Sequence, residues 1–379
     1  MPPVRILSFD QVQATLSALK ADQILRNQAQ AFYAFKNQQT QTPQRISTTS
    51  KDHTTLYMPA RIDSMTSVVK IVSIPLQSSP FGLPGFSVVL DNDTAEARGL
   101  VNARLLTAVR TAAGSALATK MVLEARSKTT TEEPLNLVVF GSGAQAKAHV
   151  QLIIQSVPSP FRIAKVTIVN RTAPRGEALL KDLGHLFPSV PLELVLTATE
   201  PESSSSPSLE QAVRQADIIC TCTNSREPLF DSTWVRPGTH LNLVGSFKPE
   251  MQEIDQALVQ RSHIIVDSTE ACAHEAGELM RAQKWKDEHP EQTTYRGVLA
   301  ELGELVDAQG NILYDRVPSA WKRAAGNSSS SSKDKREGDD DSSFVTLFKS
   351  VGIAAQDVAI TCLVLEEAEA NNIGTMVEL

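Results

Sequence analysis

The sequence predicts an α/β protein with two domains, one of which is built on a doubly wound sheet. Three observations predict this fold class. The chain has 379 residues, of which 41% are hydrophobic, so it can bury two cores of ordinary size. From about residue 135 onward, short apolar runs alternate with helical or loop lengths, which is typical of a parallel sheet. Before residue 127, helical periodicity occurs together with β-branched runs, which favours a second α/β domain.

The first part of the chain begins with a predicted helix over residues 9–25, and Asp10 is suited to cap its N-terminus. β-branched runs such as residues 67–74 predict strands. Turn-forming residues at 91–94 indicate a hairpin, and an alanine-rich helix is expected over residues 102–126.

Six short apolar runs then predict the strands of the doubly wound sheet. They are Leu135 to Phe140, Val166 to Val169, Leu192 to Leu196, Asp217 to Cys222, His240 to Val244 and Ile264 to Asp267. Residues 203–206 and 327–343 are low in complexity and are expected to be disordered surface insertions. Because the six strands already complete the sheet, the apolar segment after residue 343 is expected to return to the first domain.

Composition and charge exclude several classes of function. The formal net charge of −7 disfavours a nucleic-acid partner or an anionic membrane, since both require a dense basic surface. No segment approaches the roughly 20 apolar residues of a transmembrane helix, and the N-terminus lacks the features of a signal peptide, so a cytoplasmic protein is expected. The four cysteines lack metal-ligand spacing, so neither a disulfide framework nor a zinc site is predicted.

The strongest local signal is a glycine turn directly after the first of these strands. It comprises Gly141, Ser142, Gly143, Ala144 and Gln145. Gly141 permits a tight turn, and Gly143 lets the backbone approach a pyrophosphate at the N-terminus of a helix, where N–H groups favour anions. An ordinary strand-to-helix turn is the alternative, but the alternating strands that follow favour a Rossmann dinucleotide site.

The second strand ends in Asn170, Arg171 and Thr172, and this tip predicts the choice of cofactor. An NAD-specific domain usually places Asp or Glu here to bind the ribose hydroxyls. Arginine cannot accept those hydrogen bonds but can pair with a 2′-phosphate. The tip therefore favours NADP(H), with NAD(H) as the alternative, unless Arg171 is only a solvated loop charge.

Three spaced cations in the first domain are candidate substrate ligands: Arg45, Lys70 and Arg110. Lys70 interrupts a β-branched strand, and Arg110 lies among alanines on a helix. Buried cations are costly unless they are paired, so a bound carboxylate explains both. Taken singly, each also fits a surface residue whose stem is buried.

These motifs resemble the ornithine cyclodeaminase/mu-crystallin family. Segments that carry the resemblance follow in order along nearly the whole chain, at residues 7–12, 58–60, 90–116, 140–146, 244–255, 266–268 and 348–352. The resemblance implies a homodimer and an NAD(P)-dependent oxidoreductase. It assigns residues 1–126 with 344–379 to a substrate-binding and dimerisation domain, 127–326 to the Rossmann domain, and 327–343 to an insertion.

The resemblance also implies residue roles. Arg45, Lys70 and Arg110 would hold the substrate carboxylate, and Lys70 would in addition polarise or protonate the reacting C=N group. Ornithine cyclodeaminases and related alanine dehydrogenases carry an aspartate where this chain has Phe247. The mu-crystallin branch of the family also lacks this aspartate. A phenyl ring cannot pair with the ammonium group of a substrate, so deamination is disfavoured.

The expected function is therefore an NADPH-dependent reductase of small carboxylate-bearing imines, of the ketimine or pyrroline-2-carboxylate type, in amino-acid or secondary metabolism. Two alternatives are a lyase that converts ornithine to proline and ammonia, and a non-enzymatic protein that binds NADPH and a small ligand.

Overall fold

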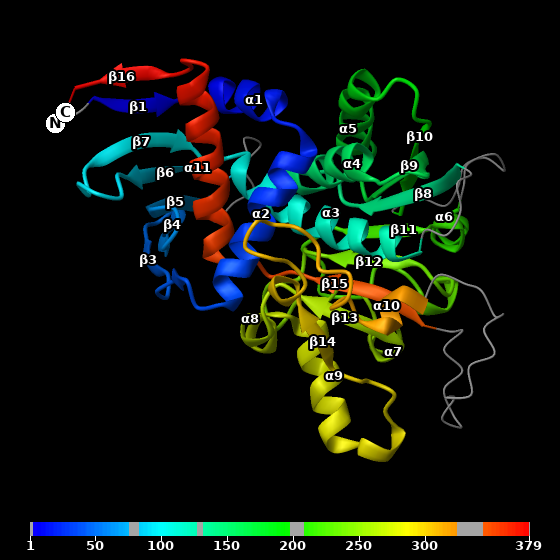
Figure 1. The fold of residues 1–379 in the computed structure, drawn as a ribbon. Coiled ribbons are helices and arrows are strands. Elements are labelled where there is room, and N and C mark those ends of the chain that lie inside the picture. The colour runs from blue at the N-terminus through cyan, green and yellow to red at the C-terminus, as the bar shows by residue number, and fades with distance from the viewer. Residues whose placement is uncertain (1–2, 76–82, 127–131, 198–207, 324–343, 379) are drawn as a thin grey trace. The chain divides into compact units, whose positions relative to one another are not determined.

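The computed structural model describes residues 3–75, 83–126, 132–197, 208–323 and 344–378, whose elements are labelled in Figure 1. The chain divides into two compact units. Unit 1 comprises Met1–Gly114, Val306–Ile312 and Gly352–Leu379, and unit 2 comprises Ser115–Leu305 and Leu313–Val351. The low-complexity segments predicted at 203–206 and 327–343 lie outside the described residues.

Unit 1 is built on a mixed sheet in the order β16-β1-β7-β6-β5-β4-β2, with β3 paired to β4. Its strands are β1 (Val4–Leu7), β2 (Thr40–Gln41), β3 (Ile46–Thr49), β4 (His53–Ile62), β5 (Ser67–Pro75), β6 (Gly85–Leu90), β7 (Ala97–Asn102) and β16 (Thr375–Val377). The predicted hairpin is confirmed, because β6 and β7 pair antiparallel. Asp91 Oδ1 stabilises the turn between them by accepting hydrogen bonds from the backbone N–H groups of Asp93 (3.0 Å) and Thr94 (2.9 Å).

One face of this sheet is covered by helices, of which α11 (Ala354–Ala370) packs against α2 (Ala21–Lys36), β4 and β5. Figure 1 shows α11 in red, lying across the strands. The helix approaches closely at Gly99, where an added Cβ would lie 2.7 Å from a methyl carbon of Leu365. The C-terminal helix therefore belongs to unit 1.

The single helix predicted at residues 9–25 is wrong, because the structure has α1 (Phe9–Ala18) followed by α2. Leu19 and Lys20 adopt extended backbone conformations, and the side chain of Gln23 accepts a hydrogen bond from Lys20 N that starts the second helix. The N-cap of α1 is also not Asp10 but Ser8, which forms a capping box with Gln11.

Unit 2 is built on a parallel sheet in the order β10-β9-β8-β11-β12-β15-β13-β14. Its strands are β8 (Glu133–Phe140), β9 (Phe161–Asn170), β10 (Leu192–Leu196), β11 (Ile218–Thr221), β12 (His240–Leu243), β13 (Ser262–Val266), β14 (Val298–Glu301) and β15 (Val345–Lys349). Its helices include α4 (Ala144–Ser156), α5 (Ala173–Leu186), α6 (Leu209–Gln215), α7 (Gln256–Gln260), α8 (Thr269–Glu275), α9 (Gly277–Glu288) and α10 (Ser319–Arg323). The predicted doubly wound α/β fold is confirmed.

Two strands of this sheet were not predicted, and one of them corrects the expectation that the chain leaves the sheet before residue 344. β15 inserts between β12 and β13, and all five of its residues are buried. Periodicity predicts this apolar run as the start of the returning helix, but that helix begins only at Ala354, after Gly352.

A further difference concerns α3 (Leu106–Arg126), since the two units divide inside this helix, between Gly114 and Ser115.

The strand order has a functional consequence. β8 lies between β9 and β11, so successive strands are added first on one side of β8 and then on the other. In doubly wound sheets, ligands bind outside the carboxyl ends of the strands at such a switch point.

None of the helices in the described part of the chain has the length and apolar character that crossing a membrane requires.

Candidate active site

The turn after β8 has the geometry of a phosphate-binding loop. Gly141 adopts a left-handed conformation with φ 107°, and an added Cβ would lie 2.8 Å from the carbonyl oxygen of Cys222. Its N–H donates to the carbonyl of Val169, at 2.9 Å. The positive φ and the close approach to Cys222 both require glycine at this position.

The N-terminus of α4 follows this turn. Gly143 is the N-cap and provides no side-chain cap, and a Cβ added to it would meet no atom within 4 Å. Ser142 precedes it, and Ala144 and Gln145 form the first helical positions. A helix start with open space at its cap and backbone N–H groups in its first turn fits the phosphates of a dinucleotide.

The tip of β9 lies at the adjacent strand end. Asn170 Nδ2 donates to the carbonyl oxygen of Thr172 at 2.7 Å, which fixes the turn into α5. Arg171 is exposed in this turn. Arg175 is exposed in the first turn of α5, and sequence analysis missed it as a second cation near the tip.

In unit 1, Lys70 and Arg110 meet at a buried carboxylate that sequence analysis also missed, Asp357 of α11. Lys70 Nζ donates to Asp357 Oδ2 at 2.6 Å, and Arg110 Nε lies 3.4 Å from Asp357 Oδ1. The side chains of Lys70 and Asp357 are each only 5% exposed. Two buried cations therefore share one carboxylate in this cluster.

Gln356 and Gly352 fix the position of the guanidinium group. Arg110 Nη1 donates to Gln356 Oε1 at 3.1 Å, and Gln356 Nε2 donates back to the carbonyl of Arg110 at 3.0 Å. Gly352 has φ 88°, and an added Cβ would lie 2.5 Å from Arg110 Nη1. The guanidinium plane is thus held in place from two sides.

Burial and the neighbouring charges have opposite effects on the pKa values of Lys70 and Asp357. Burial lowers the pKa of Lys70, and the positive charges of Arg110 and Arg45 lower it further, whereas the charge and hydrogen bond of Asp357 raise it. Burial alone raises the pKa of Asp357, but the neighbouring cations outweigh that effect and hold it below its ordinary value. Asp357 is therefore the group that favours a charged Lys70.

Arg45, the third predicted cation, is exposed and immediately precedes β3. It lies close enough for its charge to affect Lys70. The structure thus brings Lys70 and Arg110 together directly and places Arg45 within electrostatic range of them. The assigned roles of all three remain predictions.

Phe247 lies just beyond the carboxyl end of β12, in unit 2, and its side chain is 42% exposed. Lys248 Nζ lies 5.8 Å from the centroid of its ring. An aromatic ring at this strand end offers an apolar surface and no proton acceptor.

Comparison with known proteins agrees with this architecture. A model of the ornithine cyclodeaminase/mu-crystallin family matches residues 7–372. A Δ(1)-pyrroline-2-carboxylate reductase from Bacillus cereus is 28% identical over 364 residues, covering 94% of this chain and 95% of the relative.

Solved structures share the fold. The Thermococcus litoralis Δ(1)-pyrroline-2-carboxylate reductase in complex with NADH and L-proline has a TM-score of 0.72 at 21% identity, covering 98% of this chain and 99% of that one. An archaeal alanine dehydrogenase dimer with bound NAD has a TM-score of 0.70 at 21% identity, covering 100% and 99%. With the family match spanning nearly its whole length, the chain belongs to the ornithine cyclodeaminase/mu-crystallin family.

Proposed function

We propose that this protein is an NAD(P)-dependent reductase of small carboxylate-bearing imines. The observation that carries the proposal is the cluster in which Lys70 and Arg110 share the single carboxylate of Asp357. Among the residues that the structure describes, Asp357 is the anion that these two buried cations contact, which leaves a positive charge for an organic acid to balance. The similarity to a pyrroline-2-carboxylate reductase supports the same reaction class.

The reaction needs a hydride at the imine carbon and a proton at the nitrogen, which together convert C=N to CH–NH. The dinucleotide would supply the hydride when bound, and the turn from Gly141 to Gln145 would hold its phosphates. Lys70 Nζ would donate the proton, while Arg110 and Arg45 would hold the carboxylate. A positioned acid typically contributes about 10²–10⁴-fold to such a step.

Steady-state assays test this proposal against its two alternatives. We expect NADPH to be consumed with Δ1-pyrroline-2-carboxylate or Δ1-piperideine-2-carboxylate. Release of ammonia from ornithine without net oxidation of NADPH would instead identify a cyclodeaminase, which Phe247 disfavours. Tight binding of NADPH without either reaction would identify a binding protein.

We further propose that NADP(H) is the preferred cofactor, because Arg171 and Arg175 place two permanent positive charges at the tip of β9. Arg171→Asp should reverse the preference toward NADH, since a carboxylate accepts hydrogen bonds from ribose hydroxyls and repels a 2′-phosphate. The ratio of kcat/KM for NADPH and NADH measures this change. Arg162→Asp, at the other end of the same strand, is the control, and an unchanged ratio in Arg171→Asp would make Arg171 a bystander.

We also propose that the protein forms a homodimer through the sheet face of unit 1 that is opposite α11. Neighbouring residues on this face are apolar but only half-buried or exposed in the single chain: Tyr57, Val69, Ile71, Phe86, Val88 and Leu100. The structurally similar alanine dehydrogenase is a dimer. A second copy of the chain is therefore the proposed partner of this face.

Ile71→Glu should convert the dimer to a monomer, because the interface would then bury two unpaired carboxylates. Sedimentation equilibrium measures the change. Leu186→Glu, which alters an exposed leucine of α5 in unit 2, should leave the dimer intact. A dimer that persists in Ile71→Glu would place the interface elsewhere.

A further inference from the structure

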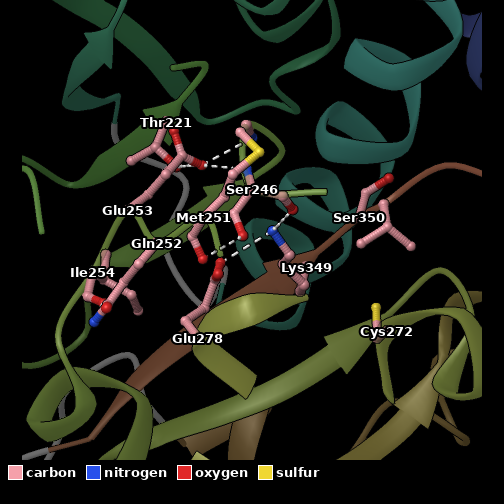
Figure 2. Close-up of polar contacts among 12 residues, drawn as sticks. Thr221, Ser246, Met251, Gln252, Glu253, Ile254, Cys272, Glu278, Lys349 and Ser350 are labelled. Carbon is pink, nitrogen blue, oxygen red and sulfur yellow. Dashed lines mark hydrogen bonds and ion pairs between the residues drawn. The ribbon is translucent and has the colours of Figure 1, made fainter. Parts of the chain in front are cut away.

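A fully buried carboxylate and a fully buried lysine connect the carboxyl ends of three neighbouring strands, β11, β12 and β15 (Figure 2). We propose that Glu253 and Lys349 are positioning residues that set the geometry of hydride transfer without contributing to phosphate binding. The inference rests on the proposed reductase function. It adds a second group of functional residues, in unit 2, to the cations of unit 1.

Glu253 joins the loops that follow β11 and β12. Its Oε2 accepts hydrogen bonds from Thr221 Oγ1 (2.7 Å) and from the N–H groups of Gly245 (2.8 Å) and Ser246 (3.2 Å). Its Oε1 accepts from the N–H group (2.9 Å) and the hydroxyl (2.7 Å) of Thr223. Each carboxylate oxygen therefore accepts from backbone N–H groups of a different loop: Oε1 from the loop after β11, and Oε2 from the loop after β12.

Close packing restricts this arrangement further. A Cβ added to Gly245 would lie 2.0 Å from the carbonyl oxygen of Thr223 and 2.3 Å from Glu253 Oε1. The two loops consequently approach each other at a distance that only glycine allows. The carboxyl group of Glu253 lies against this contact and accepts hydrogen bonds from both loops.

Lys349 connects the third strand. It is the last residue of β15, and its Nζ donates to the carbonyl oxygen of Ser246 at 2.5 Å and lies 3.0 Å from Glu278 Oε1. The side chains of Lys349 and Glu278 are both 0% exposed. Ser246 is thus held by Glu253 through its N–H group and by Lys349 through its carbonyl, so its peptide units are fixed on both sides, as Figure 2 shows.

The position of this network in the sheet indicates what it orients. The order β10-β9-β8-β11-β12-β15 is that of a dinucleotide-binding sheet, in which β8 to β10 form the first mononucleotide half and β11, β12 and β15 the second. The glycine turn belongs to the first half. The loops after β11 and β12 belong to the second half, which would take the nicotinamide of a bound dinucleotide, and Phe247 directly follows the clamped Ser246.

Burial of these charges supports a role in orientation. Buried ion pairs are often no more stabilising than apolar residues of similar volume, so in this protein we expect the network to act by fixing one arrangement of the two loops. Burial raises the pKa of Glu253 above its ordinary value, because the charge of Lys349 and the threonine hydrogen bonds, which lower it, offset only part of the effects of burial and of the neighbouring Glu278. The five donors that face the carboxylate require it to act as an acceptor at both oxygens.

Glu253→Gln is the decisive variant. In either orientation of the amide, its NH₂ group would face backbone N–H donors, so one loop must move. We expect kcat to fall about 10²-fold, as a displacement near 1 Å can cause, and the primary isotope effect with 4-deuterated NADPH to rise. The Kd for NADPH, measured by calorimetry, should change by less than about threefold, whereas the fluorescence emission of the bound nicotinamide should shift.

Asp255→Asn is the matched control, because Asp255 is a carboxylate of the same segment that caps α7 outside this network. It should retain wild-type kcat, isotope effect and emission. Glu253→Asp, which keeps the charge, should recover part of the kcat that Glu253→Gln loses. If Glu253→Gln does not fold, Thr223→Val keeps the side-chain shape but removes the hydroxyl, which donates to Glu253 and accepts a 3.3 Å hydrogen bond from the Ser225 N–H group. The same pattern of effects is then expected at a smaller size.

Three results would overturn the inference: wild-type kcat and emission in the variants, a loss of kcat matched by an equal loss of NADPH affinity, or a lower Tm as the only change. Failure of the proposed function is distinguishable from these. If the wild-type protein binds NADPH but reduces no imine, the positioning role can still be tested. The test compares the fluorescence emission of bound NADPH in Glu253→Gln and in the wild type, at an unchanged Kd for NADPH. A shift supports it, and an unshifted emission contradicts it.

Discussion

Lys70→Met is expected to lower kcat by about 10²–10⁴-fold, the usual contribution of a positioned acid, while the affinity for NADPH stays nearly intact. Methionine keeps an unbranched apolar stem that ends at Cε but removes the ammonium group that donates to Asp357. The proton donor of the proposed reaction is then lost. The glycine turn that would hold the dinucleotide lies in unit 2, whereas Lys70 lies in unit 1, so NADPH binding should not depend on this substitution.

Stopped-flow absorbance at saturating substrate and calorimetric titration with NADPH measure the two effects. Arg61→Met is a suitable control, because Arg61 is a cation on the neighbouring strand β4 that pairs with the exposed Asp63. It should behave as the wild type. A Lys70→Met protein that retained its kcat, or that lost its NADPH binding, would show that the assigned role is wrong.

Asp357→Asn should move the alkaline limb of the pH–kcat profile to lower pH. Lys70 must be protonated to act as an acid, and burial lowers its pKa while Asp357 raises it. Removal of the carboxylate charge leaves the lowering effects of burial, Arg110 and Arg45, so Lys70 loses its proton at a lower pH. Above the displaced limb the variant should lose most of the roughly 10²–10⁴-fold acid contribution, at pH values where the wild type retains it.

Glu369→Gln provides the matched control for this experiment. Glu369 lies on the same helix, α11, where it accepts hydrogen bonds from Arg98 at a partly exposed position. Its replacement should leave the pH profile unchanged. A profile that did not move in Asp357→Asn, combined with a lower Tm, would assign Asp357 a structural role only.

The parts of the site that are local in sequence could be predicted from it. The glycine turn, the Asn170–Arg171–Thr172 tip and the six strands are each encoded within about ten residues, so apolar runs and turn chemistry indicate them directly. Lys70 stood out as a cation within a β-branched strand. The structure buries Lys70, but the carboxylate that it contacts is Asp357 of the chain itself and not a bound ligand.

The parts that depend on distant pairing were missed. Asp357 is 287 positions from Lys70, and inside an apolar helix its charge gives no indication of its partner. β15 is a five-residue buried strand, and such a run cannot be distinguished from the start of a helix by periodicity. No role could be assigned to Glu253 from the sequence, because its five donors come from two other segments.

The most direct test of the central claim is to follow the hydride itself. NADPH deuterated at the transferable C4 position should be incubated with the protein and Δ1-pyrroline-2-carboxylate, and the product examined by NMR and mass spectrometry. We predict proline that carries one deuterium at the carbon of the former C=N bond. Proline without deuterium, or NADPH that binds but is never oxidised, would contradict imine reduction by this protein.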